Sequence, residues 1–125
     1  FPACPAIART RADMEGARLP AHLEAHAILR LAESLGGFAS VIEKGERDAG
    51  TLLVVTIYRS EPARLFERMP QLDGSRRFVQ ARIQDTENPG EFWDYLKKRK
   101  RQDGDIWILE ADIADHARFV AAING

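Results

Sequence analysis

The sequence contains one cysteine, Cys4, so no disulfide bond can form within the chain. Small secreted domains usually rely on several disulfides, so a disulfide-stabilised secreted fold is excluded. Cys4 lies between Pro2 and Pro5, in a stretch without helical or strand periodicity. We expect an unremarkable thiol there, because a reactive thiol needs a nearby base or cation and only Arg9 and Arg11 are near in sequence.

Long apolar runs and a large net charge are also missing. The longest apolar runs are as short as residues 52–55, so we expect no membrane-spanning segment. The 18 Lys and Arg residues nearly balance the 19 Asp and Glu residues, which leaves a net charge of -1. This balance excludes a protein that is basic throughout and coats nucleic acid, although a local basic patch remains compatible with it.

The length and composition fit one folded domain. The chain has 125 residues, of which 45% are hydrophobic and 30% charged, and this composition argues against disorder. No repeat or linker divides residues 17–125, which we expect to form a single domain. Residues 1–13 lack the apolar core of a secretory signal. We expect residues 1–16 to be an N-terminal extension and Met14 to be the biological start.

Two segments show helical patterns. Residues 19–35 carry Pro20 in the first turn and end at the pair Gly36-Gly37, as helices commonly do. One apolar stripe is expected on this helix: Leu23, Ala27, Ile28, Leu31 and Leu35. Glu24 interrupts that stripe. The second helix is expected from the capping sequence 88–91 to about Gly104, with Phe92, Trp93 and Leu96 directed inward.

Five segments show strand patterns. The strands are expected at residues 38–44, 51–59, 64–69, 76–83 and 106–109. The first two are expected to pair as a hairpin and the first four to form a meander, whereas the last is apolar on both faces and so central. The tail, residues 111–125, fits either a short helix or an edge strand.

These elements predict a single α+β domain in the order αββββαβ. A mostly antiparallel sheet of four to five strands would have two main helices packed on one face. Burial on the other face would be thinner, and one sheet edge would be exposed. Such an edge makes a homodimer through the sheet a candidate assembly.

Three functional hypotheses remain open, and no cofactor is expected. The first is a non-enzymatic protein-interaction module with an unknown protein partner, because the sequence carries no catalytic signature. A glycine-bounded turn and a nearby aromatic strand would form its contact surface: Lys44, Arg47, Asp48 and Trp107.

The second hypothesis, less favoured, is binding of nucleic acid or another polyanion. The basic run at the end of the second helix would contact phosphates, together with two arginines of a strand. Its candidate residues are Arg76, Arg77, Lys97, Lys98, Lys100 and Arg101. The alternative explanation is a solvated helix end, because cations at the C-terminal end of a helix suit the helix dipole.

The third and weakest hypothesis is a metal-dependent hydrolase or nuclease, which would need at least two acidic side chains that meet in a cleft and bind a divalent metal. A separate weak candidate for a metal site is the pair His22 and His26, which are one helical turn apart, a spacing found in metal sites. The zincin pattern needs a Glu directly after the first His, where Leu23 stands instead. We expect these histidines to lie on the surface without a metal.

Ordered pieces of the sequence resemble one known family. These pieces are Arg18-Leu19-Pro20-Ala21, Gly36-Gly37-Phe38-Ala39, Lys44-Gly45, Asp48-Ala49-Gly50 and Asp105-Ile106-Trp107-Ile108-Leu109-Glu110. They are similar to the alphaproteobacterial domain-of-unknown-function 1491 family over residues 18–120. The resemblance implies a small bacterial cytoplasmic protein. It transfers no catalytic residue, because the family carries no established activity.

Overall fold

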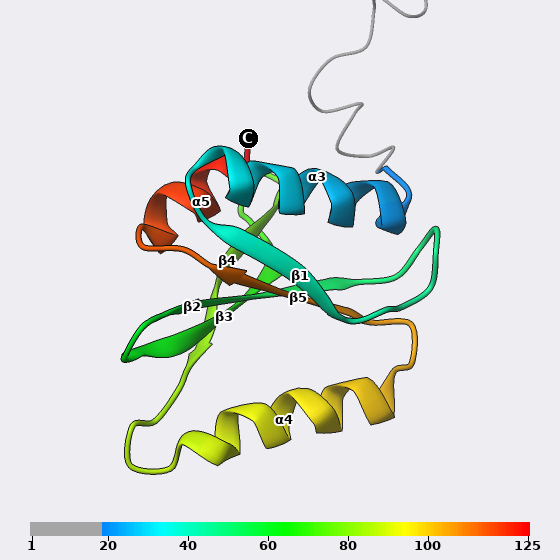
Figure 1. Ribbon diagram of the computed structural model, residues 1–125. Coiled ribbons are helices and arrows are strands. Elements are labelled where there is room, and N and C mark those ends of the chain that lie inside the picture. Colours follow the sequence, from blue (N-terminus) through cyan, green and yellow to red (C-terminus); the bar gives the residue numbers. More distant parts are fainter. Residues whose placement is uncertain (1–18) are drawn as a thin grey trace, which may run out of the picture.

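A five-stranded sheet runs through the computed structural model of the chain, which describes residues 19–125 (Figure 1). The elements in chain order are α3 (Ala21–Ser34), β1 (Phe38–Glu43), β2 (Leu52–Tyr58), β3 (Glu61–Pro70), β4 (Arg76–Ile83), α4 (Pro89–Gln102), β5 (Trp107–Asp112) and α5 (His116–Ile123). The predictions about Cys4, Met14 and the extension of residues 1–16 lie outside the described residues.

The strand order in the sheet is β1-β5-β2-β3-β4. Strands β2, β3 and β4 form an antiparallel meander, but β1 is not part of it, contrary to the prediction from the sequence. Strand β5 lies between β1 and β2, antiparallel to the first and parallel to the second. The predicted central position of the last strand is therefore confirmed. The predicted hairpin of residues 38–44 with 51–59 is wrong, because β1 pairs with β5 instead.

Burial explains why β5 separates β1 from β2. The first five residues of β2 are all buried, as are the first three of β5, so each strand needs a neighbour on both sides and cover on both faces. Strand β1 buries only Ala39 fully and can therefore occupy an edge.

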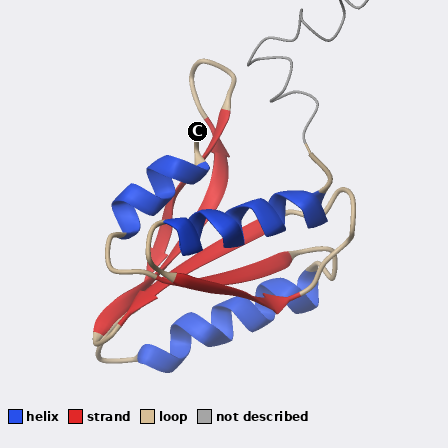
Figure 2. Ribbon diagram, turned by 45° about the horizontal axis from the view of Figure 1, so that its top comes forward, coloured by secondary structure: helices blue, strands red, loops and turns tan. Residues whose placement is uncertain are grey.

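Helices cover both faces of the sheet, so the expectation of two main helices on one face is wrong. Helices α3 and α5 lie on one face and α4 lies on the other (Figures 1 and 2). The cause is visible in β2, where Leu52 and Val54 belong to one buried cluster and Leu53 and Val55 to a second one. Because successive side chains of a strand point to opposite faces, the apolar run of β2 needs a helix on each side.

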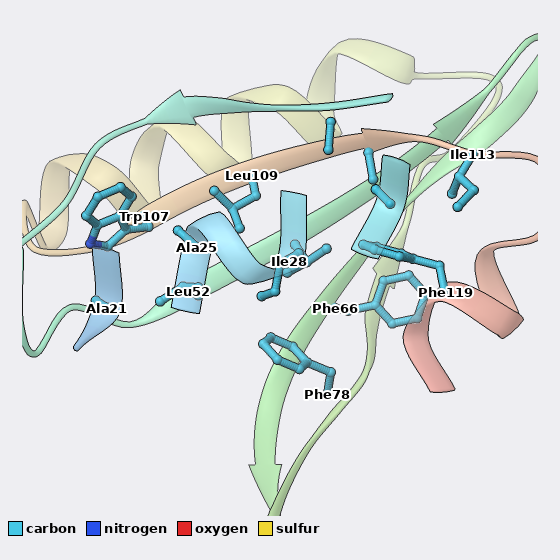
Figure 3. Packing of buried hydrophobic residues seen from close by; sticks show 14 residues of the cluster. Ala21, Ala25, Ile28, Leu52, Phe66, Phe78, Trp107, Leu109, Ile113 and Phe119 are labelled. Atoms are coloured by element: carbon cyan, nitrogen blue, oxygen red, sulfur yellow. The ribbon is translucent and has the colours of Figure 1, made fainter. Parts of the chain in front are cut away.

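The larger cluster lies between the sheet and the pair α3 and α5 (Figure 3). Helix α3 contributes mainly small side chains to this cluster: Ala21, Ala25, Ile28 and Ala32. These alanines let the helix lie close to the sheet. The apolar stripe predicted from the sequence is rotated relative to this one, since Ile28 is buried but Leu23 is 47% exposed.

Glu24, which interrupted the apolar pattern of the first helix, has a specific partner. Its carboxylate accepts two hydrogen bonds from the guanidinium of Arg68 on β3, and the Nη1–Oε1 distance is 3.0 Å. Arg68 also lies over the ring of Phe78, 4.6 Å from its centroid. The pair ties α3 to the outer half of the sheet while remaining partly buried.

The tail forms helix α5, which Asp115 caps by accepting a hydrogen bond from the backbone N–H of Arg118. The complete order is therefore αββββαβα, and the expected single-domain α+β class with a mostly antiparallel sheet is confirmed. Within residues 19–125, no helix has the length and apolar character needed to cross a membrane.

Candidate interaction site

The glycine-bounded turn, residues 44–50, holds the start of α3 in place. Pro20 precedes the helix, and no side chain caps its first turn. The backbone carbonyls of Asp48 and Arg47 instead accept hydrogen bonds from the N–H groups of Ala21 and His22, at 3.0 and 2.9 Å. Loop carbonyls thus satisfy two of the N–H groups that every helix start leaves unpaired. The side chains of Arg47 and Asp48 remain 75% and 70% exposed.

The same turn packs against the chain just before β5. The N–H of Glu46 donates to the carbonyl of Asp105 at 3.0 Å. A Cβ atom on Gly45 or Gly50 would lie 2.1 or 2.3 Å from that same carbonyl oxygen, so only glycine allows this approach. We call residues 44–50 and 103–107, together with the start of α3, the junction.

Trp107 belongs to the interior of the junction. Its side chain is 3% exposed, and its indole Nε1 donates a hydrogen bond to the carbonyl of Glu46 at 2.7 Å. This corrects the expectation that Trp107 forms part of a contact surface. An apolar strand buried on both faces leaves no room for an exposed ring, so of the four candidate contact residues only Lys44, Arg47 and Asp48 are exposed.

Lys100 also serves the junction. Its ammonium group donates to the carbonyls of Lys44, Gly104 and Ile106 at 2.6, 2.7 and 2.9 Å. All three of its donors therefore have acceptors within the chain. The final turn of α4 is held to both loops of the junction by this one side chain.

The six predicted nucleic-acid contacts lie in two separate places. Lys97, Lys98 and Arg101 are exposed at the C-terminal end of α4, and Lys100 is engaged in the junction. Arg76 and Arg77 are exposed at the start of β4 and, as neighbours in a strand, point to opposite faces. The start of β4 lies near α5, on the opposite side of the sheet from α4 (Figure 1). The nucleic-acid surface stays a prediction.

The arginine inside the basic run also has intramolecular partners. Arg99 donates to a carboxylate oxygen of Glu67 at 2.9 Å and to the hydroxyl of Tyr95 at 3.0 Å. The hydrogen bond that Arg99 donates to Glu67 is the main cause that raises the pKa of Arg99. The solvated-helix-end interpretation therefore describes only the outer part of the run.

The two histidines of α3 do not form a metal centre with other described residues. The Nδ1 of His22 lies 3.1 Å from the carbonyl oxygen of Arg47, and His26 is exposed. Within residues 19–125, no three His, Cys, Asp or Glu side chains are grouped so that they could hold a metal ion.

The two edges of the sheet differ. At the β4 edge, the side-chain amide of Asn124 accepts a hydrogen bond from the N–H of Phe78 at 2.7 Å and donates one to its carbonyl at 3.0 Å. This side chain occupies the place that a further strand would take. At the other edge, β1 has β5 as its sole strand neighbour, and no other group of residues 19–125 hydrogen-bonds to it.

The open edge carries exposed apolar and acidic side chains. Register pairs Phe38 with Asp112, Ser40 with Glu110 and Glu43 with Ile108. Residues paired across two strands have their side chains on the same face of the sheet. Ile108 belongs to the buried cluster beneath α4, so the side chains of these pairs lie on the face that α4 covers. The buried cluster beneath α4 contains no residue of β1, and Phe38 is 66% exposed.

We name this surface the β1 edge surface and define it by six residues. They are Phe38, Ser40, Ile42, Glu43, Glu110 and Asp112. Ile42 stands where the register of β1 shifts and is 47% exposed. Sequence reasoning missed this surface because it paired residues 38–44 with the wrong strand. The available signal was the alternation of Phe38 and Ser40 with the buried Ala39.

The surroundings of Glu110 on the β1 edge surface disfavour the charged form of its carboxyl. Partial burial, and secondarily the neighbouring charge of Asp112, raises the pKa of the Glu110 carboxyl. None of Glu43, Glu110 and Asp112 forms an ion pair within the part of the chain that the structure describes. The surface therefore presents three carboxylates without an ion-pair partner among the described residues, beside an exposed phenyl ring.

Solved structures of similar proteins match the fold over most of the chain. A crystal structure of a DUF1491 family protein from Caulobacter crescentus is 34% identical, with a TM-score of 0.71 over 82% of this chain and 94% of that one. An NMR structure of a DUF1491 family protein from the same organism is 33% identical, with a TM-score of 0.66 over 82% and 92% of the two chains.

A third comparison comes from another bacterium. The solution structure of a protein from A. tumefaciens is 26% identical, with a TM-score of 0.67 over 82% of this chain and 92% of that one. Comparison with curated proteins gives no match. The family model described as "Protein of unknown function (DUF1491)" matches residues 19–121. The chain therefore belongs to the DUF1491 family, as its sequence motifs indicated.

Proposed function

We propose that this protein is a non-enzymatic protein-interaction module whose partner docks on the β1 edge surface. The observation that carries the proposal is the contrast between the two sheet edges. Asn124 closes the β4 edge at Phe78, whereas no residue of 19–125 pairs with the backbone of β1 on its outer side. An open strand edge is a template for another strand, and proteins that do not use such an edge usually cover or charge it.

The exposed apolar side chains support the same surface. Phe38 exposes 66% of its area and Ile42 exposes 47%, although both belong to a strand. Aromatic rings placed beside free backbone groups supply the apolar contacts that protein interfaces favour. Lys44, the residue after β1, extends the surface with an exposed side chain, and Arg47 and Asp48 follow in the turn. We place this interaction in the bacterial cytoplasm, as the family resemblance implies.

Site-specific photo-crosslinking tests the proposal in living cells. A photoreactive phenylalanine analogue at position 38 should give a defined adduct of higher mass, because the ring there would lie in the interface. The matched control carries the same analogue at Leu72, which is fully exposed in the turn between β3 and β4. The absence of an adduct at position 38, or the same adducts at both positions, would contradict the proposal.

A further inference from the structure

We infer that the β1 edge surface accepts an extended peptide segment with Lys or Arg at alternate positions, added to the sheet as a sixth strand. This inference rests on the proposed function and names the chemistry of its partner. It combines three features of one surface: the backbone of β1, which has no partner on its outer side among residues 19–125, the exposed Phe38, and three carboxylates on the same face.

The backbone supplies the first part of the recognition. Residues 38–41 of β1 pair with β5 in regular register, and the register shifts only after Val41. A partner strand can therefore form a short regular ladder along these residues before the irregularity at Ile42 ends it. Alternate residues of the added strand then point to the face that carries Phe38.

The carboxylates near β1 favour an added strand with cationic side chains. Glu110 and Asp112 lie on β5 beside Ser40 and Phe38, and Glu43 ends β1 on the same face. A strand beside β1 would place alternate side chains within reach of these carboxylates. Long cationic side chains there would relieve the mutual repulsion of Glu110 and Asp112. An anionic partner would meet three carboxylates of like charge on this face.

The same charges disfavour a second copy of this chain. Pairing β1 with β1 of another molecule would bring two sets of three carboxylates onto adjacent parts of one continuous sheet. Like charges across neighbouring strands destabilise pairing. The homodimer through the sheet expected from the sequence would use this edge, so it becomes a distinguishable outcome of the test.

Binding of synthetic peptides tests the inference directly. The probe is a capped peptide that alternates Arg and Val over six residues. Two control peptides alternate Glu and Val, or carry the Arg residues with Pro in place of the central Val, because proline lacks the N–H that a strand donates. We expect the Arg-Val peptide to bind and both controls to bind at least tenfold more weakly.

Matched variants of the protein distinguish attraction by the carboxylates of the β1 edge surface from attraction by the negative charge of the whole protein. The double variant E110Q and D112N should bind the Arg-Val peptide about tenfold more weakly than the native chain. The control variant E87Q and D94N removes two exposed carboxylates outside the β1 edge surface, one before α4 and one in it, and should bind like the native chain. Hydrogen exchange should show new protection of amides in β1 when the peptide is bound.

The outcomes distinguish this inference from the proposed function. Equal binding to both variants, or protection outside β1, would overturn the basic-strand inference. If no peptide binds although the crosslink at position 38 forms, the inference fails and the proposed function stands. If sedimentation shows a dimer that F38D converts to a monomer, the occupant is a second copy and the inference is wrong. If neither crosslink nor peptide binding is seen, both fail.

Discussion

The indole N–H of Trp107 donates a hydrogen bond to the backbone carbonyl of Glu46 at 2.7 Å, across 61 residues of sequence. This contact joins the two segments that most resemble the family, the Lys-Gly and Asp-Ala-Gly turn and the Asp-Ile-Trp strand. Together with Lys100 and the start of α3, they form one junction. The junction has a structural role, since its hydrogen bonds fix the ends of α3, α4 and β5.

The two junction glycines are expected to be indispensable for stability. G45A and G50A place a Cβ atom within 2.1 and 2.3 Å of the Asp105 carbonyl oxygen, so the backbone must shift. We expect each to lower the free energy of unfolding by about 3 kcal/mol in urea denaturation. G104A is the control, because nothing lies within 4 Å of its Cβ position. A loss for G104A equal to that for G45A would refute the explanation by close approach.

Lys100 is expected to stabilise the fold rather than to contact a ligand. K100M keeps the apolar length of the side chain but removes three hydrogen bonds to carbonyls. Water can replace the ammonium at the exposed carbonyls of Lys44 and Gly104, but less readily at Ile106. We therefore expect a loss of about 1–2 kcal/mol in the free energy of unfolding. K98M changes an exposed cation, and a comparable loss there would show that general charge is responsible.

Thr56 carries the one buried side-chain oxygen that lacks a hydrogen-bond partner within the described residues. Its side chain is 2% exposed, so folding removes the hydroxyl from water without replacement. We expect T56V to raise the free energy of unfolding by about 1 kcal/mol, measured by thermal and urea denaturation. T51V is the exposed control. Destabilisation by T56V would mean that the hydroxyl has an acceptor after all.

The carboxyl of Glu110 is expected to make stability depend on pH. Its pKa is raised in the folded chain, so the folded state holds this proton more tightly than the unfolded state does. The free energy of unfolding therefore falls as pH rises from the ordinary glutamate pKa of about 4.3 through the raised value. Two other carboxylates lie on the same face of the sheet as Glu110: Asp112, two residues later in β5, and Glu43, which pairs with Ile108.

The variant E110Q isolates this contribution. It should unfold less readily than the native chain at neutral pH, and the difference should disappear at low pH, where Glu110 is protonated in both states. Urea denaturation across the acid range measures the two curves. A pH-independent difference between E110Q and the native chain would contradict the assignment to this carboxyl.

Local patterns predicted most elements but not their pairing. The apolar run after Thr51 and the capping sequence at Asn88 identified β2 and α4, because both signals are contained in a few neighbouring residues. The strand that pairs with β1 is β5, which follows more than sixty residues later. A pattern in a few neighbouring residues cannot identify a partner so distant in sequence. Trp107 was misassigned to a surface for the same reason, since its burial depends on the turn around Glu46.

The sequence by itself determined the α+β class, the order of the first seven elements, the central position of the last strand and the family. Each of these depends on periodicity, capping or short motifs. The tertiary structure alone decided that α4 covers the face opposite α3, that the ammonium of Lys100 donates all its hydrogen bonds within the chain, and that β1 is the open edge. Those properties depend on which surfaces and backbone groups meet when distant segments pack. The order of residues along the chain does not show which of them will meet.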